Sequence, residues 1–234
     1  MAEPDRQRRL ITLRAAAASA AAGCTLAGAG AVTTAVLAGP GPGFSAYVSE
    51  AGIAGSGHAP MYRIGVFALA AGLLLLAVAL PPQLRVAAAL LGAGSASTAL
   101  SGAVTCSAGC PLPPFERATV ADLVHGGASI AATAAVVLAM VAVTLCREAG
   151  GRLRRLSAVA ATLALPLCAA IGLAMLLVGR STLVGVLERV VLAIAVLWGL
   201  AAATTVGLAQ QEEEATNAAG SPTSEGIDHR LPPL

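Results

Sequence analysis

Long apolar runs alternate with short polar segments along most of the chain. A helix needs about 20 apolar residues to cross the hydrocarbon core of a bilayer. Six runs are close to this length or longer, and charged residues, Gly or Pro separate them: residues 15–38, 61–80, 86–104, 119–145, 156–178 and 182–209. The pattern predicts an all-α fold, a polytopic transmembrane bundle of six helices that occupies residues 15–209.

The segments between and beyond these runs predict the rest of the organisation. Residues 1–14 form a basic N-terminus that we expect in the cytoplasm. Residues 39–60 predict a loop with a short interfacial helix, because Gly39-Pro-Gly-Pro-Gly43 cannot hold a regular helix. Pro81-Pro82-Gln83 predicts a tight turn that makes a hairpin of the second and third runs. Residues 210–234, where Gly, Ser, Pro and Thr follow three Glu, predict a disordered cytoplasmic tail.

Two of the runs carry additional information. The first follows an Arg-rich start and is rich in small residues, which also suits a secretory signal peptide. The apolar core of a signal peptide spans about 7–15 residues, and this run is longer, so we favour a helix that stays in the membrane. In the fifth run, Pro166 removes one backbone hydrogen bond, and we expect a helix kink there.

The composition agrees with a membrane location. Only 11% of the residues are charged and 57% are hydrophobic, whereas a soluble domain carries about 25% charged residues. Small residues recur every four positions in two runs, and such rows allow helices to pack closely in lipid: Ser19, Gly23, Ala27 and Ala31, and then Gly94, Thr98 and Gly102. We expect membrane lipids as partners, and a protein partner or a second copy of the chain on these faces.

The distribution of Arg predicts the orientation. All fourteen basic residues are Arg, and the net charge of +2 is too small to indicate nucleic-acid binding. Nine Arg fall on one side of the predicted bundle and four on the other: Arg6, Arg8, Arg9, Arg14, Arg85, Arg147, Arg152, Arg154 and Arg155, against Arg63, Arg117, Arg180 and Arg189. Because the more basic side stays in the cytoplasm, we expect both termini inside and the loops at 39–60, 105–118 and 179–182 outside the plasma membrane.

The loop after the third run contains Cys106-Ser-Ala-Gly-Cys110-Pro. Disulfides persist outside the cell, and a loop that folds back at Gly109 brings the two Cys within bridging distance, so a disulfide is our main prediction. Free thiols, metal-binding thiols and a catalytic dithiol stay open as alternatives. The other three Cys lie in or at the ends of runs, where Cys behaves as a small apolar residue: Cys24, Cys146 and Cys168.

Ionisable residues at the start of the fourth run predict a second feature. Thr119 and Asp122 have the spacing of a helix N-cap followed by an acid at the third helical position. His125 lies three residues further on the same face, where Asp122 could orient and charge its imidazole.

His125 lies six residues into the fourth run and Glu188 six residues into the sixth. At 1.5 Å per residue, we expect both at a depth of about 9 Å in the membrane. Ionisable groups inside a membrane are costly and usually pair with one another. We therefore predict a polar cluster in the outer leaflet, with Glu50 of the first loop as a lid: Arg63, Asp122, His125, Glu188, Arg189 and Glu50. A structural ion-pair network, a ligand or proton site, and separate snorkelling at the interface are the three interpretations that we weigh.

Motifs for common cofactors are not found in the sequence. It has no phosphate loop, no Gly-x-Ser-x-Gly and no His-Glu-x-x-His, and its three His cannot ligate two haems. A single haem between His58 and His125 has no support from spacing. We expect no cofactor and no metal centre.

Several of these motifs occur together in a known family. The Cys-x-x-x-Cys-Pro loop is followed by Asp122-Leu-Val-His125-x-x-x-Ser, and Ser49-Glu50-x-Gly52 precedes Arg63-x-Gly65. In these motifs the chain resembles the bacterial and archaeal six-helix membrane proteins grouped as domain of unknown function 998, over about residues 15–209. The resemblance implies a six-helix integral membrane protein with outer-side polar motifs, and it implies no activity.

Two classes of function follow from these predictions. The first is a protein that binds, senses or transports a small molecule, a lipid or a proton at the polar cluster. The second is an intramembrane enzyme that uses Asp122 and His125, which ranks lower because no nucleophile or full set of metal ligands accompanies them. A structural accessory subunit of a membrane complex is a further alternative.

Overall fold

A computed structural model describes residues 3–38, 47–53 and 55–219. In this part the chain forms six α-helices, two short 3-10 helices and no strand: α1 (Glu3–Ala38), η2 (Val48–Gly52), α2 (Ala59–Ala79), η3 (Pro82–Leu84), α3 (Arg85–Ala103), α4 (Val120–Leu145), α5 (Gly151–Leu177) and α6 (Thr182–Ala219). All six α-helices are long and apolar enough to cross a membrane. The predicted all-α fold with six spans is confirmed.

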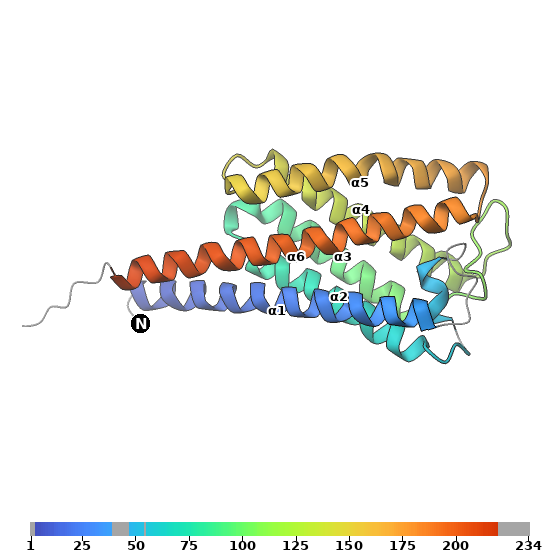
Figure 1. The fold of residues 1–234 in the computed structure, drawn as a ribbon, viewed down its shortest axis with the longest axis horizontal. Helices are drawn as coiled ribbons and strands as arrows, with labels where there is room; N and C mark the ends of the chain where they lie inside the picture. Colours follow the sequence, from blue (N-terminus) through green and yellow to red (C-terminus); the bar gives the residue numbers. More distant parts are fainter. Residues whose placement is uncertain (1–2, 39–46, 54, 220–234) are drawn as a thin grey trace, which may run out of the picture.

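The helices form a closed ring in which each packs on its neighbours in sequence and α6 returns to α1. The predicted hairpin of α2 and α3 is present, with η3 at its turn. Figure 1 shows that the start of α1 and the end of α6 lie at one end of the bundle. η2 and the loop between α3 and α4 lie together at the opposite end, which we call the loop end (Figure 1).

Two polar contacts join helices near the end that carries the termini. The indole Nε1 of Trp198 on α6 donates a hydrogen bond of 2.9 Å to Oγ of Ser157 on α5, and both side chains are buried. Gln210 Nε2 of α6 donates to the carbonyl oxygen of Ala79 at 3.0 Å. Both bonds give a buried donor its acceptor, which a membrane interior does not supply.

Glycine allows the closest helix contacts. A Cβ atom at Gly28 of α1 would lie 2.7 Å from the carbonyl oxygen of Gly65 on α2, and one at Gly102 of α3 would lie 2.8 Å from Val66. The row of small residues at 94, 98 and 102 therefore packs inside the bundle. The row at 19, 23 and 27 is exposed along α1.

The structure differs from the predicted domain limits at both ends. α1 already begins at Glu3, and α6 continues to Ala219, although we predicted disorder from Gln210 onward. Gln, Glu and Ala are good helix formers, and the bond from Gln210 to Ala79 holds the extension on the bundle. The predicted Gly-Pro loop at 39–43 and the tail at 220–234 lie outside the described residues. Pro166 lies within α5, which is helical on both sides of it.

Candidate functional site

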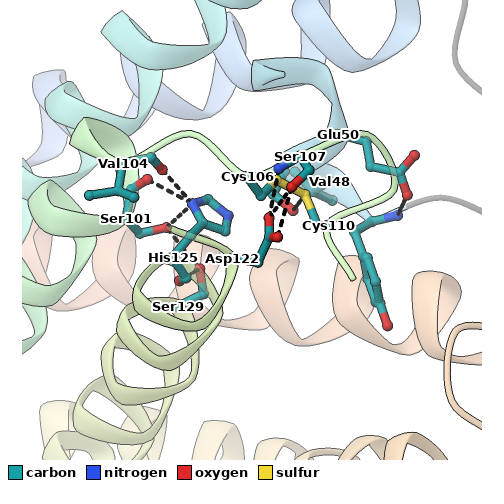
Figure 2. Close-up of a disulfide and its surroundings, with 12 residues drawn as sticks. Val48, Glu50, Ser101, Val104, Cys106, Ser107, Cys110, Asp122, His125 and Ser129 are labelled. Carbon is teal, nitrogen blue, oxygen red and sulfur yellow. Dashed lines mark hydrogen bonds between the residues drawn. A yellow bond between two sulfur atoms is a disulfide. The ribbon is translucent and has the colours of Figure 1, made fainter. Parts of the chain in front are cut away.

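Asp122 connects the start of α4 to the loop that precedes it. Its side chain is only 1% exposed. Oδ2 accepts hydrogen bonds from the backbone N and Oγ1 of Thr119 at 2.8 and 2.7 Å. Oδ1 accepts from the backbone N and Oγ of Ser107 at 2.7 and 2.8 Å (Figure 2). Thr119 is the N-cap of α4 and accepts from the backbone N of Asp122, as its spacing predicts. The carboxylate therefore both caps the helix and holds the loop.

The loop itself is closed by a disulfide between Cys106 and Cys110, as predicted. A turn inside it is fixed by a bond from the backbone N of Cys110 to the carbonyl of Ser107 at 2.9 Å. Gly109 and Cys110 both have positive φ, at 84° and 44°, and Cys110 occupies a left-handed conformation that costs a residue with a Cβ about 1–2 kcal/mol. Ser49 of η2 places its Oγ 3.4 Å from Sγ of Cys110.

His125 is oriented by α3 and not by Asp122. Its Nδ1 lies 2.9 Å from the carbonyl oxygen of Ser101 and 2.8 Å from that of Val104. Because a carbonyl only accepts, Nδ1 carries the proton and Nε2 has a free lone pair. Nε2 is buried and has no hydrogen-bond partner among the described residues, and Figure 2 shows it on the side of the ring that faces the disulfide. The hydrogen bond that we expected between Asp122 and His125 is therefore not formed.

A cavity of about 370 Å³ extends from this site into the bundle, and all six α-helices contribute to its lining. One wall, on α3 and α4, is polar: Thr98, Ser101, His125, Ser129 and Thr133. The hydroxyls of Ser101 and Ser129 lie 2.8 Å apart and join the two helices. The remaining wall is mainly apolar and includes Val32, Val66, Leu69, Ile171, Met175 and Val191.

Glu188 lines the loop end of the cavity from α6. Its Oε2 accepts a hydrogen bond of 3.0 Å from the backbone N of Val48, so the carboxylate holds η2 over the cavity. Tyr47, directly before η2, also lines the cavity. Burial, and secondarily the negative charge of Glu188, raise the pKa of the Tyr47 phenol above its usual value. The phenol therefore stays protonated at neutral pH and can donate a hydrogen bond.

Part of the cavity lining on α4 and α5 is also exposed on the surface of the bundle. Ile130 of α4 lines the cavity and is 58% exposed, and Gly172 of α5 lines it and is also exposed. This surface belongs to helices apolar enough to span a membrane. In a bilayer these two lining residues would face lipid.

The six residues of the predicted polar cluster separate into two groups. Asp122, His125 and Glu188 line the cavity, whereas the other three are not among its lining residues. Arg63 donates to the carbonyls of Gly102 and Ala103 at 3.3 and 3.0 Å, where the end of α3 leaves carbonyls without helical partners.

The other two predicted residues lie near the cavity in different contacts. Glu50 forms an ion pair of 2.8 Å with Arg180, which lies in the turn between α5 and α6. Arg189 donates to the carbonyl of Gly185, one turn earlier in α6, at 2.8 Å. Neither side chain extends the polar wall of the cavity.

The sequence interpretation did not assign several polar residues of the site, among them Ser101, Ser107, Ser129 and Thr133. Ser129 and Thr133 continue the face of His125 at helical spacing, and this pattern could have revealed them. Ser107 gave no such signal, because its role depends on a loop folding back to Asp122.

Among the described residues, one group of three side chains could together bind a metal ion, and their donor atoms are all within 4.8 Å of one another: Cys106, Cys110 and His125.

Six helices that are long and apolar enough to cross a membrane identify a multi-pass membrane protein. The family described as "Protein of unknown function (DUF998)" matches residues 19–205, and the chain belongs to that family. The match confirms the resemblance drawn from the loop motifs. Neither the curated proteins nor the solved structures gave a match to the chain.

Proposed function

We propose that the protein binds a small lipid-soluble amphiphile in the cavity between its helices. The observation that supports this proposal best is a cavity of about 370 Å³ that has one polar wall and, on α4 and α5, lining residues exposed on the surface of the bundle. Ligand pockets have volumes of about 300–1,000 Å³ and combine apolar walls with a few oriented polar groups. A molecule that enters between α4 and α5 would arrive from the bilayer.

The polar groups of the cavity favour a ligand whose head donates hydrogen bonds. In its ionised form the Glu188 carboxylate accepts only, and the backbone N of Val48 occupies one of its acceptor sites. An ammonium or hydroxyl head would find acceptors at Glu188 and at the hydroxyls of Ser129 and Thr133. A carboxylate head would meet the negative charge of Glu188 in a poorly solvated site, where like charges repel strongly.

We place this site on the outer side of the plasma membrane. The end of the bundle that carries the termini also carries most of the Arg, and the more basic side stays in the cytoplasm. The loop end, with its disulfide, then faces the oxidising exterior, where disulfides persist. Both termini are cytoplasmic in this arrangement.

The geometry favours binding over catalysis by Asp122 and His125. All described hydrogen bonds of Asp122 go to Ser107 and Thr119, so its carboxylate anchors a loop. His125 directs its free nitrogen to the disulfide side of the ring. The two side chains do not form an acid–base pair.

A comparison of two Gly→Leu variants tests the proposal. The purified full-length protein is titrated with a primary amine, an alcohol and a carboxylate that share one ten-carbon chain, and its Tm is measured. A ligand at 100 times its Kd stabilises by about 2.7 kcal/mol, which corresponds to roughly 5–10 °C for a chain of this size. We expect the amine or the alcohol to raise Tm and the carboxylate to have little effect.

Gly172→Leu should reduce or abolish this rise, because Gly172 lines the cavity and a Leu there adds bulk at its wall. Gly127→Leu is the matched control: both glycines are exposed and a Cβ at either meets nothing within 4 Å, but Gly127 does not line the cavity. Glu188→Gln should remove the preference for the amine over the alcohol. Equal responses of the two Leu variants, or a larger shift with the carboxylate, would contradict the proposal.

A further inference from the structure

We propose that reduction of the Cys106–Cys110 disulfide creates a binding site for a thiophilic d10 ion, Zn²⁺ or Cu⁺. The ligands are the two Cys Sγ atoms and Nε2 of His125. Cys110 and His125 also line the cavity, but the metal site does not depend on amphiphile binding: it depends on the covalent state of the loop, and its test does not use an amphiphile.

The ring of His125 is held in the way that is usual for a metal-binding His. A metal-binding His usually donates its other ring N–H to a carboxylate or a backbone carbonyl, which fixes the ring and frees the ligating nitrogen. His125 has this arrangement, with Nδ1 donating toward the carbonyls of Ser101 and Val104. Its side chain is 5% exposed and Nε2 has no described partner. A buried polar atom without a partner is costly, and a bound cation would remove that cost.

The two sulfur atoms and the His125 nitrogen lie close enough together to bind one ion. The donor atoms of Cys106, Cys110 and His125 are all within 4.8 Å of one another. Zn–S bonds of about 2.3 Å and Zn–N bonds of about 2.0 Å place tetrahedral ligands roughly 3.5–3.8 Å apart. Once the S–S bond is broken, each nitrogen–sulfur gap must close by no more than about 1.3 Å. Rotation of the freed Cys side chains covers such a distance without a change in the helices.

The loop keeps its position by bonds that do not depend on the disulfide. The Asp122 carboxylate accepts hydrogen bonds from the backbone N and Oγ of Ser107, the residue after Cys106. The carbonyl oxygen of Ser107 in turn accepts a hydrogen bond from the backbone N of Cys110. Ser49 Oγ is a hydroxyl donor 3.4 Å from Cys110 Sγ, and a donor at this place stabilises a thiolate. Both thiols therefore stay beside His125 after reduction.

An external dithiol is the reductant that opens the disulfide. Two electrons and two protons pass from the dithiol to Cys106 and Cys110, the S–S bond breaks, and the donor becomes a disulfide. Binding of the ion then forms two metal–sulfur bonds and releases the two thiol protons. Thiolates and an imidazole select Zn²⁺ and Cu⁺ over hard ions such as Mg²⁺ and Ca²⁺. Three ligands complete a trigonal Cu⁺ site and leave Zn²⁺ one open position.

Metal titration of the full-length protein tests the proposal. Cys24, Cys146 and Cys168 are first replaced by Ser, so that only the loop thiols remain. The reduced and the oxidised protein are each titrated with Co²⁺ under anaerobic conditions, and sulfur-to-cobalt charge-transfer absorption is recorded. We expect one Co²⁺ per reduced chain and none per oxidised chain. Competition with Zn²⁺ alone and with Cu⁺ alone then identifies the preferred ion.

His125→Asn isolates the nitrogen ligand, because the Asn amide can still donate to the carbonyls of Ser101 and Val104 but lacks Nε2. Loss of outer partners of a metal ligand already costs about 10–100-fold in affinity, so this variant should bind at least about tenfold more weakly. His58→Asn is the matched control at the start of α2 and should bind as the parent does. Absence of binding by the reduced parent, or equal binding by the oxidised form or by His125→Asn, would overturn the proposal.

Discussion

Replacement of Asp122 by Asn should destabilise the loop end more than any other neutralisation of a carboxylate in the described chain. The Asn side chain offers one acceptor oxygen and one NH₂ donor in place of two acceptor oxygens. The hydroxyls of Ser107 and Thr119 can turn to accept from the NH₂ group. Their backbone N–H groups cannot turn, so one of the two is left without an acceptor.

The magnitude follows from these contacts. A buried donor without an acceptor costs about 1–3 kcal/mol, and the remaining backbone bond loses about 1 kcal/mol because its acceptor is no longer charged. The sum is roughly 3 kcal/mol, or about 6–12 °C in Tm for a chain of this size. Because Asp122 is 1% exposed, water in the folded state replaces little of this loss.

The assay is thermal unfolding of the detergent-purified protein, combined with the rate at which a reductant opens the Cys106–Cys110 disulfide. Asp122→Asn should lower Tm and accelerate reduction, because the loop has lost its anchor. Glu50→Gln is the control: the variant loses the charge that pairs with Arg180 but keeps a side-chain oxygen that can accept from the backbone N of Tyr47, so we expect a smaller loss than for Asp122→Asn. A Tm for Asp122→Asn equal to that of the control would refute the assignment of Asp122 as the anchor.

Two further predictions concern helix packing. Gly28→Ala should destabilise the bundle by about 1–3 kcal/mol, the typical cost of overpacking, because its Cβ would meet a carbonyl oxygen of α2 at 2.7 Å. The control is Gly23→Ala, where a Cβ meets nothing within 4 Å and Tm should not change. Equal effects of the two variants on Tm would contradict the close contact. Ser157→Ala should cost about 1–3 kcal/mol, because the buried Trp198 indole N–H loses its acceptor. Thr162→Ala removes an exposed hydroxyl of the same helix and should have little effect on Tm; the Trp198 fluorescence should shift only in the Ser157 variant.

The helices are the part of this structure that local sequence determines most directly. A bilayer requires apolar spans of one length, so the runs themselves locate the six helices. The start of α4 was also predictable, since the bonds between Thr119 and Asp122 need only a spacing of three residues. The end of α6 was not, because residues 210–214 suit both a tail and a helix, and the contact from Gln210 to Ala79 on another helix favours the second.

The site was predictable only where its residues share a helix. Asp122 and His125 lie on one face of α4, and this placement followed from their spacing. Their partners did not, because each comes from a different part of the chain. Ser107 reaches Asp122 across a loop, and the carbonyls that bind His125 become available only because α3 ends beside it. The pairing of Asp122 with His125 that their spacing allowed is not formed, because each side chain has other partners.

The short span of the disulfide has a consequence for how the protein responds to its surroundings. Cys106 and Cys110 are only four positions apart, so the cross-link restricts little of the unfolded chain and contributes roughly 2 kcal/mol on chain-entropy grounds. The anchor at Asp122 is worth at least as much. Opening the bond should therefore leave the six-helix architecture intact. The loop can then be reduced and reoxidised repeatedly, as the redox conditions at the loop end change, while the helices stay folded.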